Sequence, residues 1–202
     1  MGKTVMFRTF EESDADALYK WLNDDELTNM SVGLSRRLSH EEVENWVKAR
    51  KNHNPYQVFW AICPIDQPKK IIGYAYIAEI HYINSSANFD GIVIGDPDYR
   101  NGVAWVETYL FILEYAFDRL NLNRLFNTCI VQHPVSNTIS EVLFYQKEGE
   151  MREAVYKNGC YYDLAIWGIL KREYNVHKQN GEYEFTQVIR RFSRANRNKK
   201  NG

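Results

Sequence analysis

Three strand-like segments in the middle of the chain lead directly into a glycine-bearing turn and a long helix. The strand patterns cover residues 58–63, 71–80 and 87–94, with short polar turns between them. Residues 95–102 then form a turn, and apolar residues at helical spacing follow over residues 103–120. Strands joined by such short turns pair as an antiparallel meander. The middle of the chain therefore predicts a sheet that leads into a helix.

Patterns towards the N-terminus add one strand and two helices. Residues 4–9 read as a strand, and Ser13 is placed to cap a helix that runs to about Trp21. Ser39 is followed three residues later by Glu42, which is a capping-box pattern for the start of a second helix. Both helices come before the meander in the chain.

The C-terminal third adds a strand, a helix and a hairpin. Residues 125–131 read as a strand, and Ser136-Asn137 can cap a helix that runs to about Lys147 and ends at Gly149. A final hairpin is indicated by an Asn-Gly turn at 158–159 between strands 151–156 and 161–170. The order β-α-α-β-β-β-α-β-α-β-β predicts an α/β (α+β) fold with a mixed, mostly antiparallel central sheet and helices on both faces.

Length and composition fit one globular domain followed by a basic tail. Of the 202 residues, 45% are hydrophobic and 25% are charged, which is the balance of a globular protein. We expect one domain over residues 1–174. Residues 175–202 hold seven Lys and Arg residues against two Glu. We expect this tail to form one helix over residues 185–192 and a disordered end.

Charge, cysteine spacing and the N-terminus argue against several classes of protein. The net charge of −1 does not favour nucleic-acid binding, and no apolar run reaches the ~20 residues of a membrane span. Cys63, Cys129 and Cys160 have no metal-ligand spacing and are odd in number, so neither a metal site nor a disulfide framework is expected. Without an apolar stretch for a signal peptide, the sequence predicts a cytoplasmic protein.

The turn after the third strand could bind a phosphate group. A helix N-terminus offers unpaired N–H groups and the positive end of the helix dipole, and backbone amides of Asn101 to Ala104 lie there. Gly102 would let an anion approach the backbone closely, and Arg100 adds a cation. The segment is neither a GxGxxG fingerprint nor a GxxxxGK[ST] loop, and by itself it is also compatible with an ordinary turn.

This turn and three other segments resemble motifs of the GNAT acetyltransferase superfamily. The superfamily's pyrophosphate motif, [Gln/Arg]-x-x-Gly-x-[Gly/Ala], is similar to residues 99–104, with Tyr99 in the first slot. A second family pattern is similar to Tyr145-x-Lys147-x-Gly149, with Asn137 about one residue further upstream than usual. The hairpin segment 156–163 and the strand start at 70–73 also match family patterns. The resemblance covers roughly residues 4–174.

The resemblance implies an acyl-CoA-dependent N-acyltransferase that uses acetyl-CoA or another acyl-CoA and no metal. Asn137 would contact the pantetheine or acyl region, and Tyr145 would donate a proton to the departing CoA thiolate. A phenol suits this role because it is protonated at neutral pH and can still give its proton to a stronger base. The alternative for Tyr145 is an ordinary ring at a helix end. The residues implied in binding the pantetheine and the pyrophosphate through their backbone groups are Ile92, Ile94, Arg100, Asn101, Gly102, Val103 and Ala104.

The amine must lose a proton, and the sequence offers several groups that could accept it. Glu79 is the first choice, because a carboxylate surrounded by aromatic rings is a stronger base. A solvated or hydrogen-bonded Glu79 without a catalytic role is an equally good interpretation. The rings expected around it are Tyr74, Tyr76 and Tyr82, and the other candidate bases are His81, Asp90 and His133.

The acceptor amine remains open between two main classes. Residues 79–83 look like spermidine acetyltransferases, for which Asp24, Asp25 and Glu26 could pair with a polycation. Residues 97–102 and 144–147 look more like acyltransferases of nucleotide-linked amino sugars, which we favour. Aminoglycosides and protein N-termini are further options. The residues that could contact a nucleotide-linked sugar are Arg36, Arg37, Tyr74, Tyr76 and Trp105.

A different class of function also remains open. The domain could bind CoA without catalysis, or it could be an interaction module that acts through its basic tail. A small-molecule amine is the expected partner, with no nucleic acid and no membrane. The sequence does not determine the oligomeric state, for which a homodimer is one option.

Overall fold

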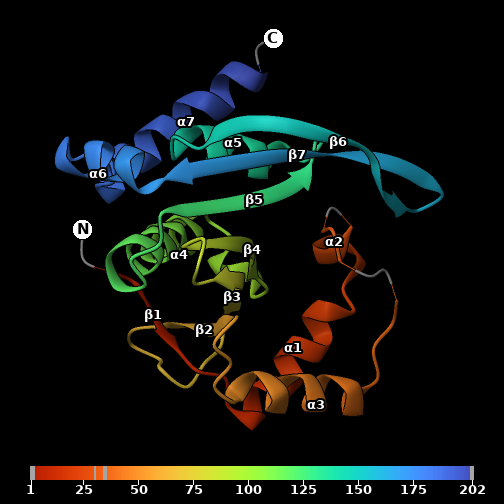
Figure 1. Ribbon diagram of the computed structural model, residues 1–202. Coiled ribbons are helices and arrows are strands. Elements are labelled where there is room, and N and C mark those ends of the chain that lie inside the picture. The colour runs from red at the N-terminus through yellow and green to blue at the C-terminus, as the bar shows by residue number, and fades with distance from the viewer. Residues whose placement is uncertain (1–2, 30, 34–35, 201–202) are drawn as a thin grey trace. The chain divides into compact units, whose positions relative to one another are not determined.

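The computed structural model describes residues 3–29, 31–33 and 36–200 and divides them into two compact units. Among the described residues, the first unit, here called the N-terminal unit, covers residues up to Ile80 and Phe89–Tyr109, and the second, the C-terminal unit, covers His81–Asn88 and the residues from Leu110 onwards. Hydrogen bonds link the seven strands in the order β1-β2-β3-β4-β5-β7-β6 (Figure 1). Residues 1–2 and 201–202 of the expected domain and tail lie outside the described residues.

The N-terminal unit is built on the antiparallel meander that the sequence predicts. β1 pairs with β2, and β2 pairs with β3 so that Phe59 lies opposite Tyr76. The Ser39–Glu42 capping box is confirmed as the start of α3, whereas Ser13 lies inside a short 3-10 turn instead of capping a helix. The elements are β1 (Val5–Arg8), α1 (Ala15–Leu22), α2 (Asp25–Thr28), α3 (His40–Lys51), β2 (Val58–Pro64), β3 (Gly73–His81), β4 (Ser86–Ile94) and the start of α4 (Val103–Glu114).

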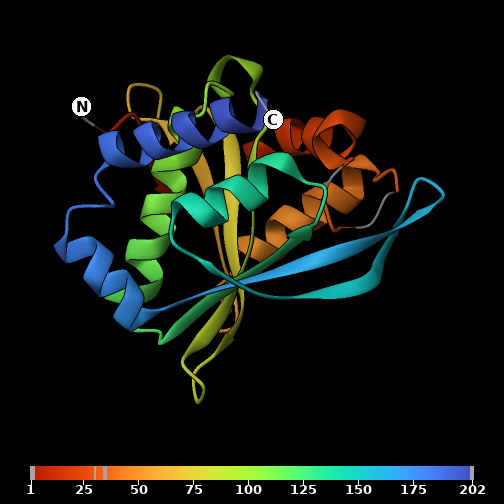
Figure 2. The ribbon, with the colours of Figure 1, turned by 90° about the horizontal axis from the view of Figure 1, so that it is seen from above.

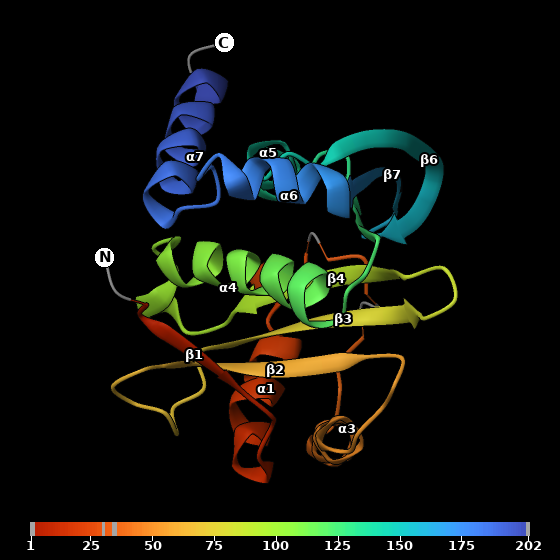
Figure 3. The ribbon, with the colours of Figure 1, turned by 60° about the vertical axis from the view of Figure 1, so that its left-hand side comes forward.

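Helices cover both faces of the meander, as the sequence predicts. Side chains alternate along a strand, so Phe59, Ala61 and Cys63 of β2 pack with the core residues of α1 and α3. Trp60 and Ile62 are also buried and point to the opposite face. Figure 3 shows α1 and α3 on one side of the strands and α4 on the other. The prediction of a mixed, mostly antiparallel sheet between helices is confirmed.

The C-terminal unit contains the parallel strand pair and the final hairpin. β4 runs parallel to β5 over Ser86–Asn88, and β5 pairs antiparallel with β7. The predicted Asn-Gly turn is confirmed, because Asn158 and Gly159 both have positive φ values, 51° and 84°. The elements are β5 (Arg124–Ile130), α5 (Pro134–Val142), β6 (Gln146–Lys157), β7 (Cys160–Leu170), α6 (Lys171–Gln179) and α7 (Phe185–Lys200).

Helix α5 is displaced along the chain relative to the prediction. It begins earlier because the His133 side chain accepts the N–H of Ser136 and Pro134 occupies the first turn, a favourable pairing of cap and proline. It ends at Val142 rather than at about Lys147, and Gly149 lies in β6 at a register shift instead of ending the helix. The final hairpin is therefore longer than expected.

The tail is more ordered than its composition predicts. The helix expected over residues 185–192 continues to Lys200 as α7, so the end expected to be disordered is helical, and α6 precedes it. Val188 of α7 is fully buried, and α7 contacts α5, as Figure 2 shows by the blue helix beside the teal one. Both tail helices belong to the C-terminal unit. Among the described residues, no helix is both long and apolar enough to cross a bilayer.

Candidate active site

The turn before α4 presents three free amide groups. Gly102 has a φ of +89°, a left-handed conformation that glycine adopts without strain. The Val103 N–H is bound by the Asn101 side chain at 3.0 Å, and the Arg100 N–H donates to the Pro97 carbonyl at 3.2 Å. In the described part of the chain, the N–H groups of Asn101, Gly102 and Ala104 have no acceptor. Three of the five amides expected to bind pyrophosphate therefore remain available.

Arg100 holds the turn against the end of β4. Its Nε donates to the Ile94 carbonyl at 3.1 Å, and one Nη donates to the Gly95 carbonyl at 2.9 Å. Gly95 in turn lies against α1, because a Cβ there would fall 2.0 Å from the ring of Trp21. The sequence suggested that Arg100 supplies a cation beside the phosphate. In the structure its guanidinium also holds the loop that presents the amides, and its role as a cation beside the phosphate stays a prediction.

The parallel ladder between β4 and β5 is short. Within the described residues, the pairing of β4 with β5 ends at Asn88 and Phe126. Ile92 is partly buried and Ile94 is buried, and the Ile94 carbonyl accepts from Arg100. Pairing of the Ile92 and Ile94 backbone with a pantetheine arm stays a prediction.

We expect replacement of Gly102 by alanine to weaken CoA binding about tenfold. No atom lies within 4 Å of the added Cβ, so the cost comes from the left-handed backbone, about 1 kcal/mol or more for a non-glycine residue. Isothermal titration calorimetry with CoA measures the change. Gly149→Ala is the matched control, since Gly149 also has open space around it but no positive φ. Equal affinities for the two variants would contradict the role of Gly102.

Glu79 is exposed and lies in an unusual backbone conformation. Its φ is +51° within β3, which is strained for a non-glycine residue. Among the described residues, the Glu79 side chain has no hydrogen-bond or ion-pair partner. Of the rings expected around it, Tyr74 and Tyr76 pack with the core of the N-terminal unit and Tyr82 is exposed. Its role as the base stays a prediction.

The other candidate bases have local structural roles or are not described. His81 Nδ1 accepts the N–H of Asn84 at 3.1 Å and so closes the turn after β3. His133 caps α5 at 3.2 Å, and burial lowers the pKa of its imidazole, which favours the neutral ring that accepts this bond. The Asp90 side chain lies outside the described residues.

Tyr145 lies between α5 and β6 rather than on the helix, where the sequence had placed it. Its side chain is 4% exposed, and its N–H donates to the Ser140 carbonyl at 2.9 Å. The preceding residue, Phe144, has a φ of +65°. Tyr145 is thus a buried phenol held at a sharp turn of the chain, in the C-terminal unit.

The Asn137 side chain is engaged with the protein itself. Its Nδ2 donates to the carbonyls of Ile130, Val131 and His133 at 3.2, 3.0 and 2.8 Å. Its Oδ1 accepts from Trp167 Nε1 at 3.0 Å and from the Cys129 thiol at 3.4 Å, and burial raises the pKa of Cys129 to about 11. Asn137 therefore joins β5, α5 and β7. A side-chain contact with the pantetheine would have to replace one of these bonds.

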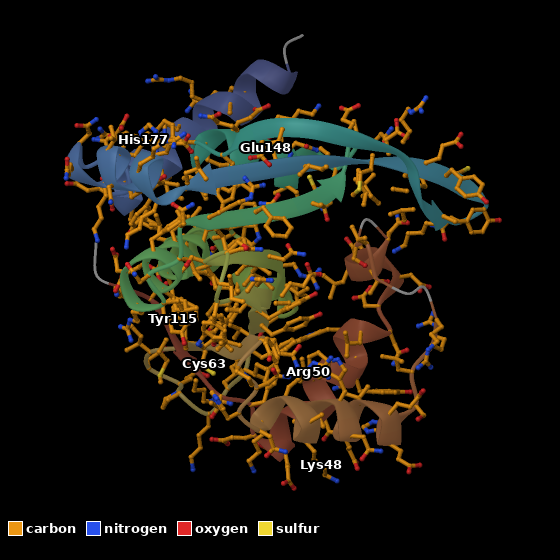
Figure 4. All side chains as sticks on the ribbon, viewed as in Figure 1. Lys48, Arg50, Cys63, Tyr115, Glu148 and His177 are labelled. Atoms are coloured by element: carbon orange, nitrogen blue, oxygen red, sulfur yellow. The ribbon has the colours of Figure 1, made fainter. Side chains whose placement is uncertain are left out.

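Arg50 and the rings around it form a cluster that the sequence did not reveal. The guanidinium carbon lies 4.1 Å from the ring centre of Trp46 and 4.9 Å from that of Phe59. Tyr76 stacks on Phe59 at 4.7 Å with an interplanar angle of 11°. The available signal was the Trp46–Arg50 spacing of four residues on one helix. Figure 4 shows Arg50 and Lys48 on opposite sides of α3.

Among the described residues, the charge of Arg50 has no counter-ion. Burial lowers its pKa, and no carboxylate in the described residues forms an ion pair with it. One Nη donates to the Trp46 carbonyl at 3.3 Å, while the buried Nε has no hydrogen-bond partner in that part of the chain. A half-buried cation beside stacked rings can bind an anionic or aromatic group.

Most of the charged residues suggested for the two acceptor classes have local partners. Asp24 caps α2 by accepting the N–H of Glu26 at 2.9 Å, and Asp25 pairs with Arg37 at 2.9 Å on the surface. Arg36 pairs with Glu42 at 2.8 Å. Two of the three carboxylates suggested for a polyamine and both suggested arginines are therefore already engaged.

Known proteins share the sequence pattern and the fold. The family model of the acetyltransferase (GNAT) domain matches residues 4–143. YoaA, an uncharacterized N-acetyltransferase of Bacillus subtilis, is 28% identical over 171 residues, covering 83% of this chain and 93% of the relative. The spermidine N(1)-acetyltransferase of Vibrio cholerae is 31% identical over 110 residues, covering 54% and 62%.

Solved structures agree on the fold. The crystal structure of spermidine N-acetyltransferase from Vibrio cholerae in complex with CoA and spermine matches with a TM-score of 0.77 at 22% identity. The match covers 86% of this chain and 99% of that one. At this identity the similarity shows the fold alone.

Proposed function

Because the chain belongs to the GNAT acetyltransferase family, we propose that it transfers an acetyl group from acetyl-CoA to a primary amine on a small molecule that also carries an anionic group. A nucleotide-linked amino sugar is the acceptor class that fits best, since its phosphates supply the negative charge. Acetyl-CoA provides the acetyl group as a thioester, which the amine attacks directly.

Arg50 is the observation that favours an acceptor with an anionic group. Burying a charge without a counter-ion is costly, and rings compensate for only part of that cost. A phosphate group would satisfy the fork of the guanidinium with parallel hydrogen bonds. Tyr76, which stacks on the buried Phe59 and is itself only partly buried, would offer part of its ring to a base or a sugar. The same cluster would repel a polycation.

In this proposal, three backbone amides and one phenol act on acetyl-CoA. The free N–H groups of Asn101, Gly102 and Ala104 at the start of α4 would bind the pyrophosphate. Tyr145 would hold a proton at its phenol oxygen for the sulfur that leaves. Glu79, exposed and without a local partner among the described residues, would accept the proton that the amine loses, directly or through water.

Polyamine acetylation is the second candidate, and the relatives favour it. A spermidine acetyltransferase is among the matched sequences, and one is among the matched structures. On this chain, however, Asp24 and Asp25 are engaged in a helix cap and a surface ion pair. Glu26 remains exposed and could contact a polycation.

The test is thiol release from acetyl-CoA with a panel of amines: several nucleotide-linked amino sugars, spermidine, an aminoglycoside and a short peptide. A longer acyl-CoA is assayed in parallel. We expect the highest kcat/KM with a nucleotide-linked amino sugar. Preference for spermidine would favour the second candidate, and absence of turnover with retained CoA binding would favour a binding module.

Arg50→Leu tests the acceptor contact itself. Losing a hydrogen bond to a charged group costs about 1.5–3 kcal/mol, so KM for the amino-sugar acceptor should rise about 10–100-fold. KM for acetyl-CoA should not change. Lys48→Leu is the matched control, because it removes the same charge from the exposed face of α3. An unchanged acceptor KM in Arg50→Leu would exclude the proposed contact.

A further inference from the structure

We propose that the C-terminal helices α6 and α7 act as a positioning element for Tyr145, by fixing the last turn of α5. This inference rests on the proposed role of Tyr145 as the proton donor. The two helices follow the region matched by the family model, which ends at residue 143. They belong to the same compact unit as α5 and Tyr145.

The tail supplies hydrogen bonds that the end of α5 lacks. The last carbonyl groups of a helix have no partner within it, and cations are favourable at this end. Arg191 Nε donates to the Val142 carbonyl at 3.2 Å, and the Tyr183 hydroxyl donates to the Leu143 carbonyl at 3.1 Å. The same Arg191 also donates to the Glu182 carbonyl at 2.7 Å. One tail arginine therefore links α5 to the turn between α6 and α7.

The tail also holds a strained residue next to Tyr145. Phe144 occupies the left-handed position after the helix, with a φ of +65°, where glycine is the usual residue. Its ring stacks on His177 at 3.7 Å and 5°, and it meets Tyr183 edge-on at 6.0 Å. The Arg191 guanidinium lies 4.6 Å from the same ring. Packing from three tail residues thus stabilises a backbone conformation that phenylalanine disfavours.

The tail is itself anchored, so it can transmit this constraint. The Tyr183 ring stacks on Tyr174 at 5.3 Å, and Tyr174 stacks on Phe117 at 4.8 Å. The Tyr174 hydroxyl donates to Asp118 at 2.8 Å, and Lys178 pairs with the same carboxylate at 2.7 Å. These contacts fasten α6 to the segment Tyr115–Arg119, which directly follows α4. Because α6 is held in place, the tail residues that contact Phe144 can fix the direction in which the backbone enters Tyr145.

The first measurement is kcat of Arg191→Leu, with Arg190→Leu as the matched control because Arg190 is exposed on the same helix. We expect kcat to fall about tenfold in Arg191→Leu, the size expected when a catalytic group loses its position, with KM for acetyl-CoA unchanged. Arg190→Leu should match the wild type. Tyr183→Phe, which removes only the hydroxyl, provides a second variant in case Arg191→Leu does not fold, and its kcat should also fall.

A double-mutant cycle separates positioning from general stability. If Arg191 acts through Tyr145, Arg191→Leu should have no further effect on kcat in the Tyr145→Phe background. An equal tenfold loss in both backgrounds would overturn the inference. If Tyr145→Phe alone leaves kcat unchanged, the proton-donor assignment fails and the inference with it.

Hydrogen exchange tests whether the tail helices hold the backbone at Phe144 and Tyr145. It needs no assay of activity, so its outcome is independent of the acceptor. The amides of Phe144 and Tyr145 should exchange about tenfold faster in Arg191→Leu than in the wild type, and should be unchanged in Arg190→Leu. Unchanged exchange at these two amides in both Arg191→Leu and Tyr183→Phe would overturn the inference even if the proposed acetyl transfer is confirmed.

Discussion

Tyr145→Phe should lower kcat by about 10²–10⁴-fold, the usual contribution of a general acid. The substitution removes one oxygen from a side chain that is 4% exposed and leaves the ring in place, so the fold should be retained. KM for acetyl-CoA should change little, because the proton is needed only when the carbon–sulfur bond breaks. Steady-state thiol release with the best acceptor measures both constants.

The control for this prediction is Tyr115→Phe, which removes the same oxygen from a tyrosine elsewhere in the C-terminal unit. Tyr115 lies on the turn that follows α4 and its ring contacts Phe111 at 5.9 Å. The kcat of Tyr115→Phe should stay near the wild-type value. A Tyr145→Phe enzyme with more than half of the wild-type kcat would show that the sulfur takes its proton from water or another group.

The meander, the helix after it and the final hairpin could be predicted because their signals are local. The apolar run of residues 58–63 and the Asn158-Gly159 turn depend only on neighbours in sequence. The start of α5 could not be predicted equally well, since His133-Pro134 reads as a break until the His133 side chain is seen to cap the helix. The same proline is favourable in the first turn of a helix.

The candidate site was predictable in outline but not in its side-chain contacts. Gly102 indicated a turn that an anion could approach closely, and in the structure this glycine has a positive φ. The partners of Arg100 and Asn137 could not be predicted, because carbonyl groups of other segments bind their side chains. Arg50 was missed for a related reason: Phe59 comes to it only when β2 packs against α3.

The tail illustrates how tertiary contacts override composition. Many charges and few apolar residues over 175–202 indicate disorder. Yet Val188 is fully buried, and Tyr183 and Arg191 bind the end of α5. A few well-placed residues are enough to order a basic helix when the surface beneath it offers unpaired carbonyl groups.

The largest loss of stability is expected for Asp14→Ala. Asp14 is 2% exposed, and both of its oxygens accept from Arg8 at 2.8 Å. It also accepts the N–H of Glu11 at 2.8 Å. Hydrogen bonding to Asp14 is the largest of the effects that raise the pKa of Arg8. Removing one partner of a buried pair leaves an uncompensated charge and costs about 3–5 kcal/mol.

This cost should appear as a fall in Tm of roughly 10 °C for a chain of this size, measured by circular dichroism. The loss should be large because Arg8 also donates to the carbonyls of Thr9 and Pro68, and so joins β1 to the turn between β2 and β3. Asp16→Ala is the matched control, since Asp16 lies on the exposed side of α1 and its side chain is 84% exposed. If both variants melt within 2 °C of the wild type, the Arg8–Asp14 pair contributes no more than a surface ion pair, and the stability of the N-terminal unit must come from its apolar core.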